Sequence, residues 1–475
     1  MSIAAWRRYH EATKHTPEKL RNNRHFLDWK NMPEPFRHYE GVPVLDLPAD
    51  ASAPKEGALE VLRGGLGVRV AREGAGFLSQ LLFHAAAVSA TKSVPSMGYS
   101  YALRVNPSSG NLHPTEFHFA TRGLAGWPDG LYHYRPSSHM VEQRGRGDFT
   151  TGLGVTGRVV FILTSIGWRE AWKYQSRAYR YCCHDIGHAW EALVQSARAC
   201  GYEAWAQAGF ADDAVAELMG VEDEWPMLLV CMDGPAGEAG SGAKEWLGGR
   251  ANRLSEEVVE YPLIDEIHRA TKVWTQASSG MVRSERLPGQ KVPGEMPFAV
   301  AVRQRRSALD FRGGAESITR EQFETLLAVA QRGLDVDFGG GFIELWAYVH
   351  RVDGVQPGLY RRGVEMVLSG DQRVAAAGLS LGQDLAGNSC VTFSMIADLE
   401  RLTALHGDRG YRYAHFEAGA IGQRLYVASE AMGFRSTGIG AFFDDAVHRY
   451  LDLEDGQVVY HFACGHPVTD QRLSG

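Results

Sequence analysis

The chain has 475 residues, of which 44% are hydrophobic and 22% charged, and its formal net charge is −7 at pH 7. This composition is typical of a globular protein with a large core, and the length predicts two or three domains. The net negative charge argues against a broad basic surface for nucleic acid. The sequence contains no run of about 18 apolar residues, so no membrane span is predicted. Six cysteines are too few for a disulfide scaffold of this size, and the first residues lack the apolar stretch of a secretory signal. We therefore expect a cytoplasmic protein with reduced thiols.

In chain order, helical and strand patterns alternate. Residues 1–55 are polar and aromatic and end in prolines, so we expect an arm packed against the body. Apolar spacing predicts a helix over 76–87, a buried strand over 159–163, a helix over 185–199 and a helix near 264–273. Residues 234–253 are rich in glycine and alanine, which predicts a linker.

A polar loop at 106–116 reads N-P-S-S-G-N-L-H-P-T-E, with prolines that stiffen both ends. Gly110 has no Cβ, so a ligand can approach the main chain there. Ser108, Ser109 and Asn111 supply hydroxyls and an amide that both donate and accept hydrogen bonds. These groups suit the mixed edge of a flat heterocycle such as a flavin ring, while an ordinary polar turn is the alternative for this stretch alone.

The chain contains an internal repeat. Arg177-Ala-Tyr-Arg-Tyr reappears as Arg409-Gly-Tyr-Arg-Tyr, an offset of 409 − 177 = 232 residues. Upstream, Gly-Leu-Tyr at 130–132 matches Gly-Leu-Tyr at 358–360, an offset of 358 − 130 = 228 residues. Matches of this length predict a duplicated α+β unit, a covalent pseudo-dimer. The predicted parts are an arm at 1–55, a first half at 56–236, a linker at 237–262 and a second half at 263–475.

The two halves differ in the residues that suit binding. Where the first half has the polar loop, the second has the glycine-rich segment 338–342, but only the second carries the triplet Arg-Arg-Ser at 305–307. The aligned segment of the first half, 60–62, is Glu-Val-Leu. Guanidinium groups match phosphate oxygens in charge and geometry, although a solvated basic turn is the alternative for the triplet alone. A phosphate clamp in one half and a ring-binding loop in the other predict a single mononucleotide site across the interface.

The triplet, followed by Phe311, and the Pro-Ser-Ser-x-Asn loop resemble the two flavin motifs of the FMN-dependent nitroreductase superfamily. The resemblance extends from about residue 75 to the end. In that superfamily one subunit of a dimer supplies the triplet and the other supplies the loop. The resemblance therefore implies an α+β nitroreductase-like fold duplicated in one chain, with one surviving FMN site. The implied cofactor-binding residues are Pro107, Ser108, Ser109, Asn111, Arg305, Arg306, Ser307, Gly438, Ile439, Gly440 and Arg472. In the C-terminal tail, Asp470 stands where a basic residue is often found.

Within the superfamily, the chain is most similar to azoline dehydrogenases of the SagB/ThcOx type. The similarity lies in Tyr-His-Glu-Ala-Thr-Lys at 9–14, Arg104 before the loop, and Lys173-Tyr174 before Arg-Ala-Tyr-Arg. An adjacent Lys-Tyr pair in that branch is implicated in oxidising thiazolines or oxazolines to azoles. The resemblance thus implies catalytic roles for Lys173 and Tyr174.

The chemistry of this pair can be expected from its residue types. An ammonium lowers the pKa of a neighbouring phenol, so Tyr174 would take a carbon-bound proton while hydride leaves to flavin N5. Adjacent residues on a helix point about 100° apart, so a joint role requires a bend there. The loop departs from this branch at 111–113, Asn-Leu-His, so the resemblance does not imply the identity of the substrate.

Two other kinds of site have less support in the sequence. Cys182-Cys-His-Asp-x-x-His188 is superficially similar to a zinc-binding helix, but its repeat counterparts are Phe416, Glu417 and Ala420, so we expect no metal site. No Gly-x-Gly-x-x-Gly follows a strand, which argues against a nicotinamide Rossmann fold.

Three functions remain as hypotheses. The first is an FMN-dependent dehydrogenase that acts on a heterocyclic or unsaturated substrate, which is either a small molecule or a peptide. The second is an NAD(P)H-dependent reductase of nitro or quinone compounds, and the third is a non-catalytic flavin-binding scaffold in a biosynthetic complex. We expect about one flavin per chain, since each half has lost part of one motif; association beyond the pseudo-dimer is not predicted by the sequence.

Overall fold

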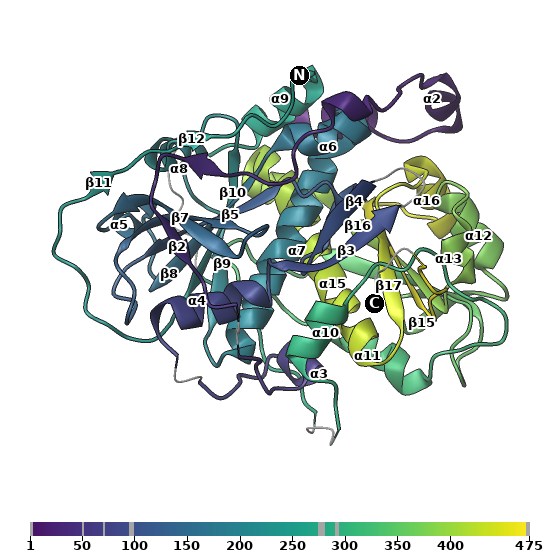
Figure 1. Cartoon of the computed structure of the whole chain (residues 1–475). Coiled ribbons are helices and arrows are strands. Elements are labelled where there is room, and N and C mark those ends of the chain that lie inside the picture. Colours follow the sequence, from purple (N-terminus) through teal and green to yellow (C-terminus); the bar gives the residue numbers. More distant parts are fainter. Residues whose placement is uncertain are drawn as a thin grey trace.

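Two long helices form the centre of the molecule (Figure 1). The structure is a computed structural model that describes residues 3–49, 52–69, 72–94, 99–273, 281–289 and 294–471. The central helices are α7 (Ala178–Ala199) and α15 (Gly410–Ala431), each of 22 residues. Nearly every residue of both is buried, because each helix packs on the other and on a sheet of its own half.

Glycines let the two central helices touch at their crossing. A Cβ at Gly187 would lie 2.2 Å from the carbonyl oxygen of Phe416, and a Cβ at Gly419 would lie 2.2 Å from that of His184. These two contacts exchange under the repeat, since 187 and 184 correspond to 419 and 416. The crossing therefore lies on the pseudo-twofold axis that relates the halves.

The first half contains an eight-stranded sheet in the order β11-β7-β6-β5-β8-β10-β9, with β2 also paired to β7. Its central strands, such as β8, are buried along their whole length. The strands are β2 (Val44–Asp46), β5 (Thr115–Thr121), β6 (Gly130–Arg135), β7 (Met140–Arg146), β8 (Val159–Ser165), β9 (Ala204–Gln207), β10 (Trp225–Met232) and β11 (Glu245–Trp246). The two-stranded sheets are β1 (Tyr39–Glu40) with β12 (Arg250–Ala251), and β3 (Val88–Val94) with β4 (Tyr99–Arg104).

The second half repeats this sheet with six strands in the order β15-β14-β13-β16-β18-β17. The registers repeat too: Val159 pairs with Met232, and Val391 pairs with Cys464. The strands are β13 (Ile343–Val349), β14 (Gly358–Arg361), β15 (Glu365–Ser369), β16 (Val391–Ala397), β17 (Arg435–Ile439) and β18 (Gln457–Gly465). The predicted α+β unit, duplicated in one chain, is confirmed.

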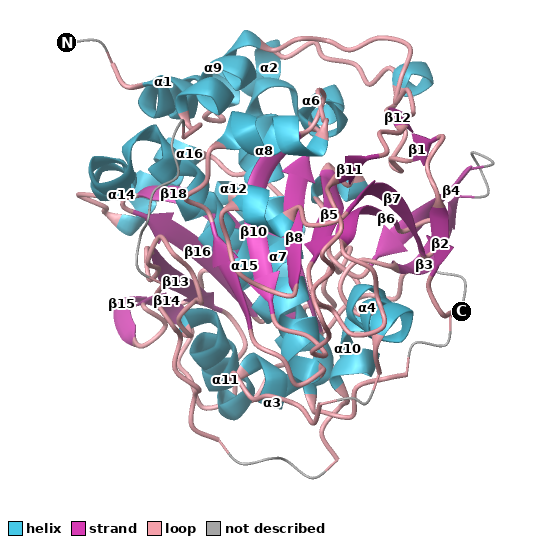
Figure 2. Ribbon diagram, turned by 90° about the vertical axis from the view of Figure 1, so that its left-hand side faces the viewer, coloured by secondary structure: helices cyan, strands magenta, loops and turns pink. Residues whose placement is uncertain are grey.

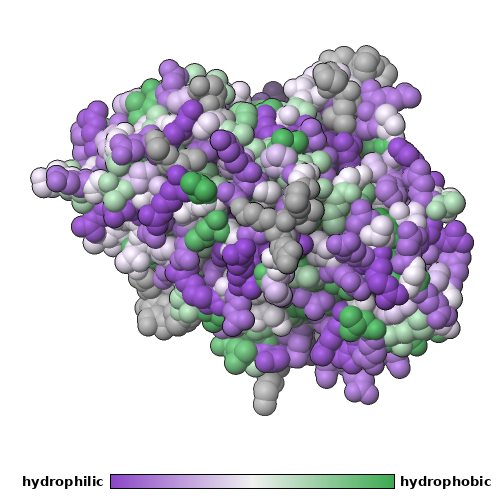
Figure 3. Space-filling model, turned by 90° about the horizontal axis from the view of Figure 1, so that it is seen from below, coloured by the Kyte–Doolittle hydropathy of each residue, from purple (hydrophilic) through white to green (hydrophobic). Residues whose placement is uncertain are grey.

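Helices cover the sheets and the ends of the central pair (Figure 2). Those of the first half and its arm are α1 (Ala5–Ala12), α2 (Pro17–Asn22), η1 (Trp29–Asn31), α3 (Ala58–Leu62), α4 (Gly74–Phe83), η3 (Ser109–Asn111), α5 (Thr150–Leu153), α6 (Gly167–Tyr174), η4 (Gln175–Arg177) and α8 (Asp212–Met219). Those that follow are α9 (Pro262–Ala270), α10 (Phe298–Gln304), α11 (Arg320–Gln331), α12 (Arg373–Leu379), α13 (Asp384–Asn388), α14 (Leu399–His406), η5 (Gly407–Arg409) and α16 (Asp444–Leu451). On the face in Figure 3, hydrophobic groups are scattered among hydrophilic ones. In the described part of the chain, no helix is long and apolar enough to cross a membrane.

The helix predicted over 185–199 begins seven residues earlier, at Ala178. Its first turns are polar in sequence but buried in the structure, because their arginines form ion pairs with the other half. Arg177 and Arg180 bind Asp444 at 3.2 Å and 2.8 Å, and Arg409 and Arg412 bind Asp212 at 2.6 Å each.

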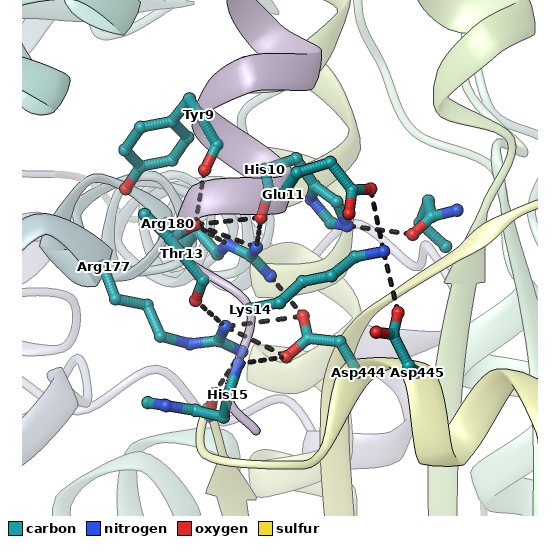
Figure 4. Close-up of polar contacts among 12 residues, drawn as sticks. Tyr9, His10, Glu11, Thr13, Lys14, His15, Arg177, Arg180, Asp444 and Asp445 are labelled. Atoms are coloured by element: carbon teal, nitrogen blue, oxygen red, sulfur yellow. Dashed lines mark hydrogen bonds and ion pairs between the residues drawn. The ribbon is translucent and has the colours of Figure 1, made fainter. Parts of the chain in front are cut away.

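The N-terminal helix completes one of these clusters (Figure 4). Thr13, just after α1, accepts a hydrogen bond from Arg180 at 3.1 Å, and Lys14 binds Asp445 at 2.9 Å. After α9, Thr271 accepts from Arg412 at 2.8 Å and Lys272 binds Asp213 at 2.5 Å. The shared pattern His-x-Ala-Thr-Lys, at 10–14 and 268–272, shows that the repeat extends into the N-terminal segment.

Candidate functional site

The main candidate site is a cavity of about 390 Å³ between the two halves. The first half contributes the loop at 106–113, the hairpin β3–β4 and residues of α6 and α7. The second half contributes 305–309 and the end of β17. The predicted site residues that line it are Pro107, Ser108, Ser109, Asn111, Tyr174, Arg305, Arg306, Ser307, Gly438, Ile439 and Gly440. Lys173 lines an adjoining cavity, and Arg472 lies outside the described residues.

The polar loop is held from below by a buried carboxylate. Asp185, on α7, accepts hydrogen bonds from the backbone N–H and the hydroxyl of Ser109, both at 3.0 Å. Asn111 uses its amide within the loop, donating to the carbonyl of Ala102 at 3.0 Å and lying 3.0 Å from His113 Nε2. Asn111 and His113 have φ of 60° and 51°, a left-handed conformation that few side chains adopt without strain. The loop is therefore a rigid, preorganised wall.

Burial raises the pKa of Asp185 to about 7, although its hydrogen bonds to the serines oppose this shift. A carboxyl group that lines a cavity and titrates near neutral pH is suited to exchange protons. The sequence argument treated Asp185 only as part of a rejected zinc helix. Its repeat counterpart is also an acid, Glu417, and this retained carboxylate was the available signal.

Lys173 and Tyr174 meet above Gly110. Tyr174 is the last residue of α6, and Gln175 has φ of 51°, so the chain bends directly after the pair. The ammonium of Lys173 lies 5.2 Å from the centre of the Tyr174 ring. A Cβ at residue 110 would lie 2.6 Å from Tyr174 Oη and 3.1 Å from Lys173 Nζ, so the absence of a side chain at Gly110 gives room to both groups.

The expected lowering of the tyrosine pKa is not found. Burial raises the pKa of Tyr174 well above its usual value, and the neighbouring Glu170, Tyr181 and Asp185 raise it further. The neighbouring ammonium can be read from the sequence, but the loss of water around the phenol depends on the folded structure. Tyr174 is therefore a neutral hydrogen-bond donor at neutral pH.

The basic triplet lies at the other end of the cavity. Arg305 donates to the carbonyls of Val105 and Arg104, each at 3.1 Å, so it joins the second half to the start of the loop. Arg306 donates to the carbonyl of Ser89 in β3 at 3.1 Å. Among the described residues, neither guanidinium forms a salt bridge, and burial together with Arg305 lowers the pKa of Arg306 to about 10. Two buried cations of this kind favour an anionic ligand.

The hairpin β3–β4 brings a third cation to this end. Lys92 lines the cavity and binds Asp470 of the C-terminal segment at 2.6 Å, with both side chains more than nine-tenths buried. The hairpin belongs to the first half but lies against the second (Figure 1). Asp470 stands where the family resemblance implies a basic residue, and it pairs with a basic residue of the other half.

Glycines 438 and 440 are required by crowding around the cavity. A Cβ at Gly438 would lie 2.1 Å from Tyr460 Oη, and one at Gly440 would lie 2.3 Å from the ring of Tyr181. Arg177 and Tyr181 donate to the carbonyl of Gly440 at 3.2 Å and 3.0 Å. The ion-pair cluster at the half–half interface therefore also positions this edge of the site.

The pseudo-twofold axis relates this cavity to a second position in the molecule, and residues of the chain itself fill that position. There Asp337 accepts from the N–H groups of Ala208 and Gly209 at 2.8 Å and 2.9 Å. Phe338 stacks on Tyr413, the counterpart of Tyr181, with ring centres 4.2 Å apart. Because Ala208 and Gly209 correspond to Gly440 and Ala441, a carboxylate occupies the position that an acceptor atom of a ligand would take in the open site.

The histidines of the rejected zinc motif pack at the helix interface. His184 stacks on Tyr460 with ring centres 4.2 Å apart, and His188 lies 3.2 Å from the hydroxyl of Tyr460. Among the described residues no group of three potential ligands is arranged to hold a metal ion. The cavity residues that the sequence did not identify as site residues include Lys92, Asp185, His188, Gln383, Tyr426 and Tyr460.

Comparison with known proteins accounts for this duplicated architecture. The model of the nitroreductase family matches the chain twice, at residues 78–234 and 302–466. The chain belongs to the nitroreductase family. The predicted nitroreductase-like fold, duplicated in one chain, is thereby confirmed, and the family indicates an oxidoreductase.

Individual relatives agree with this assignment. The crystal structure of a nitroreductase-like protein from Anabaena variabilis superposes with a TM-score of 0.77 at 25% identity, over 98% of this chain and 100% of that one. The nitroreductase-like protein MJ1384 of Methanocaldococcus jannaschii is 28% identical over 118 residues, 24% of this chain and 60% of that protein. The trifolitoxin operon protein TfxC of Rhizobium leguminosarum bv. trifolii is 26% identical over 131 residues, 26% of this chain and 37% of that protein. The chain thus spans less than two thirds of the length of the latter two.

Nitroreductase family members generally bind FMN, and the residues of this cavity fit that cofactor. The two buried guanidiniums and Ser307 suit a phosphate, and the crowded glycine edge admits a flat ring against the backbone. The orphaned buried atoms Asn106 Oδ1 and His113 Nδ1 also lie in residues that line the cavity.

Proposed function

We propose that this nitroreductase family member binds one FMN per chain and acts as a dehydrogenase of the SagB/ThcOx type. Its substrate would be a heterocyclic or unsaturated compound, such as an azoline carried by a peptide. The observation that carries the proposal is the meeting of Lys173 and Tyr174 over Gly110, at the one half–half cavity that has both the loop and the triplet. The repeat counterparts of the pair are Leu405 and His406, and the centre of the ring of His406 lies 5.1 Å from that of Tyr413 at the filled position.

In this proposal the two ends of the cavity have different tasks. Arg305, Arg306 and Ser307 hold the phosphate, while the loop at 107–111 and the segment 438–440 hold the flavin ring. Arg472 of the tail is a further candidate for the phosphate. When bound, FMN supplies an acceptor for hydride at N5.

The chain's own groups would then handle the proton and the orientation of the substrate. Asp185, with a pKa raised to about 7, is a base that is partly ionised at neutral pH and could accept the proton from the atom next to the carbon that loses hydride, so that the double bond forms between the two atoms. Tyr174 remains protonated and donates a hydrogen bond to a ring heteroatom, and Lys173 fixes the adjacent polar group. The two buried arginines of the triplet would limit the access of water to the phosphate end of the site.

A reductase working in the opposite direction is the second candidate. The relation to MJ1384 favours it, whereas the relation to a protein of a toxin operon favours a biosynthetic role with partner enzymes. Steady oxidation of NADPH with a nitroarene would support the reductase. A colourless protein that cannot be reconstituted with FMN would instead support a scaffold.

The deciding experiment combines the absorbance spectrum of the purified chain with its flavin-to-protein ratio. We expect one FMN per chain. Arg305→Ala or Ser307→Ala should weaken FMN retention, whereas Lys173→Ala should keep the flavin and slow substrate oxidation. Leu405→Ala, at the counterpart of Lys173, is the matched control. If Lys173→Ala oxidises an azoline-bearing peptide as fast as the wild type does, Lys173 is not a catalytic residue.

A further inference from the structure

A second cavity of about 440 Å³ adjoins the candidate active site. It shares Tyr101, Gly110, Asn111 and His113 with the first cavity, so the loop forms the boundary between them. We call it the aromatic annex, because its remaining wall includes Trp29, Phe36 and Trp172. The sequence argument did not use any of these three residues.

The annex is a built structure, anchored from both sides of the loop. Trp29 and Trp172 meet edge to face with ring centres 5.3 Å apart. The indole N–H of Trp172 donates to the carbonyl of Asp28 at 3.0 Å, which ties the arm to α6. From the hairpin side, Arg104 donates to the carbonyl of Pro35 at 2.6 Å, and its guanidinium lies 5.0 Å from the centre of the Phe36 ring. The arm segment 28–36 is thus held as a wall of the annex.

The catalytic pair spans the two cavities. Lys173 lines the annex, Tyr174 lines the first cavity, and Gly110 lines both. A substrate whose reacting bond lies beside Tyr174 therefore extends past Lys173 into the annex. Trp172 is 4% exposed, whereas Trp29 is 59% exposed, so one indole is fixed and the other presents open apolar surface.

We infer that the annex binds an aromatic or heteroaromatic group of the substrate, joined by a short linker to the bond that is oxidised. This inference rests on the proposed function and names the class of substrate. Aromatic rings prefer offset or edge-to-face contacts with other rings, and the annex offers several ring faces around one opening. Its two charged side chains, Lys173 and Glu34, are opposite in sign, which favours a neutral ligand group.

Calorimetric titration of the purified full-length chain tests this inference. The probe is N-acetyl-L-tryptophanamide, and the control is N-acetyl-L-alaninamide, which has the same backbone groups but no aromatic ring. We expect saturable binding of the tryptophan amide and at least about tenfold weaker binding of the alanine amide, because a ring–ring contact and its buried area together contribute this much. Equal affinity for the two amides, or no binding of either, overturns the inference.

Variants locate the binding. Trp29→Ala should weaken the tryptophan amide about tenfold, and Trp29→Phe should retain most of the affinity. Phe26→Ala is the matched control, since Phe26 lies in the same arm, is 85% exposed and does not line the annex. If Trp29→Ala and Phe36→Ala both bind the probe like the wild type, the annex is not the site. A chain that takes up no FMN but still prefers the tryptophan amide would refute the proposed function and leave the annex intact.

Discussion

Asp185 is the residue that we propose as the proton acceptor of the site. It is buried, lines the cavity and accepts hydrogen bonds from Ser109, and burial raises its pKa to about 7. A base is active in its ionised form, so oxidation by the wild type should accelerate as the pH rises through about 7. Asp185→Asn should lower turnover about 100-fold and remove this rise, since an amide accepts no proton.

The comparison variant for this test is Asp185→Glu, because glutamate is the residue at the repeat counterpart. It should recover part of the rate and keep a pH-dependent profile. An unchanged pH profile in the asparagine variant, with FMN still bound, would show that another group takes the proton.

Glu417, the repeat counterpart of Asp185, is also a buried carboxylate, and it lines a separate cavity of about 560 Å³ in the second half. It accepts from the N–H groups of Gly341 and Phe342, each at 3.0 Å, and burial raises its pKa to about 7. A raised pKa in the folded state stabilises the protein below the unfolded pKa of about 4.5, and this stability is lost as the pH rises through about 7.

Glu417→Gln keeps the acceptor and removes the ionisation. The variant should therefore gain about 1–3 kcal/mol relative to the wild type between pH 5 and pH 8. Thermal unfolding of both proteins across this range measures the difference. A constant difference between the two melting temperatures would contradict the assignment.

At the scale of elements, the hairpin β3–β4 decides how the phosphate end is built. The repeat offset falls from 245 at the α4/α11 pair (326 − 81) to 228 at the β5/β13 pair (343 − 115), and the hairpin spans this difference in the first half. Arg306 fixes it through Ser89, and Lys92 fixes it through Asp470. The hairpin thus brings a lysine of the first half to the C-terminal segment of the second half.

Lys92→Glu should weaken FMN binding about tenfold or more, because it places two carboxylates together and removes a buried cation. Adding Asp470→Lys restores the opposite charges and should recover most of the affinity. FMN dissociation constants from flavin fluorescence provide the measurement. Arg373→Glu, in an exposed pair with Asp371, is a control that should leave FMN binding unchanged. If the double variant binds no better than Lys92→Glu, the pair does not act as a unit.

At the scale of the whole molecule, two equivalent ion-pair clusters join the halves, but only one of them reaches the open cavity. Asp444 anchors Arg177, which donates to the carbonyl of Gly440 at the cavity edge. Asp212 anchors Arg409, which donates to the carbonyl of Ala208 beside the filled position. The ion-pair scaffold is therefore present on both sides, and the open cavity lies beside one of them.

Asp444→Ala and Asp212→Ala should each destabilise the chain by about 3–5 kcal/mol, because each leaves two buried guanidiniums unpaired. Only Asp444→Ala should also weaken FMN binding. Melting temperatures and FMN affinities, measured on the same preparations, separate the two effects. Equal loss of FMN affinity in both variants would show that the clusters act only through global stability.

Part of the site was predictable from particular residues. The constant offset of 232 determined that Arg177 and Arg409 are equivalent, and the retention of loop and triplet in different halves indicated one cavity between them. The pairing of Lys92 with Asp470 was not predictable, since no local pattern relates a hairpin to a tail 378 residues later (470 − 92). The raised pKa of Tyr174 was also beyond the sequence, because burial depends on what packs around the phenol.

The sequence by itself determined the duplication and the location of the loop and triplet, because repeated and turn-forming residues can be found along the chain without knowing what packs against them. The tertiary structure decided which side of the pseudo-dimer stays open. Asp337 and Phe338 fill one side, while glycines 438 and 440 leave the other accessible. It also decided that the arm encloses an annex beside Lys173 and Tyr174, since contacts between distant segments depend on packing and burial rather than on spacing along the chain.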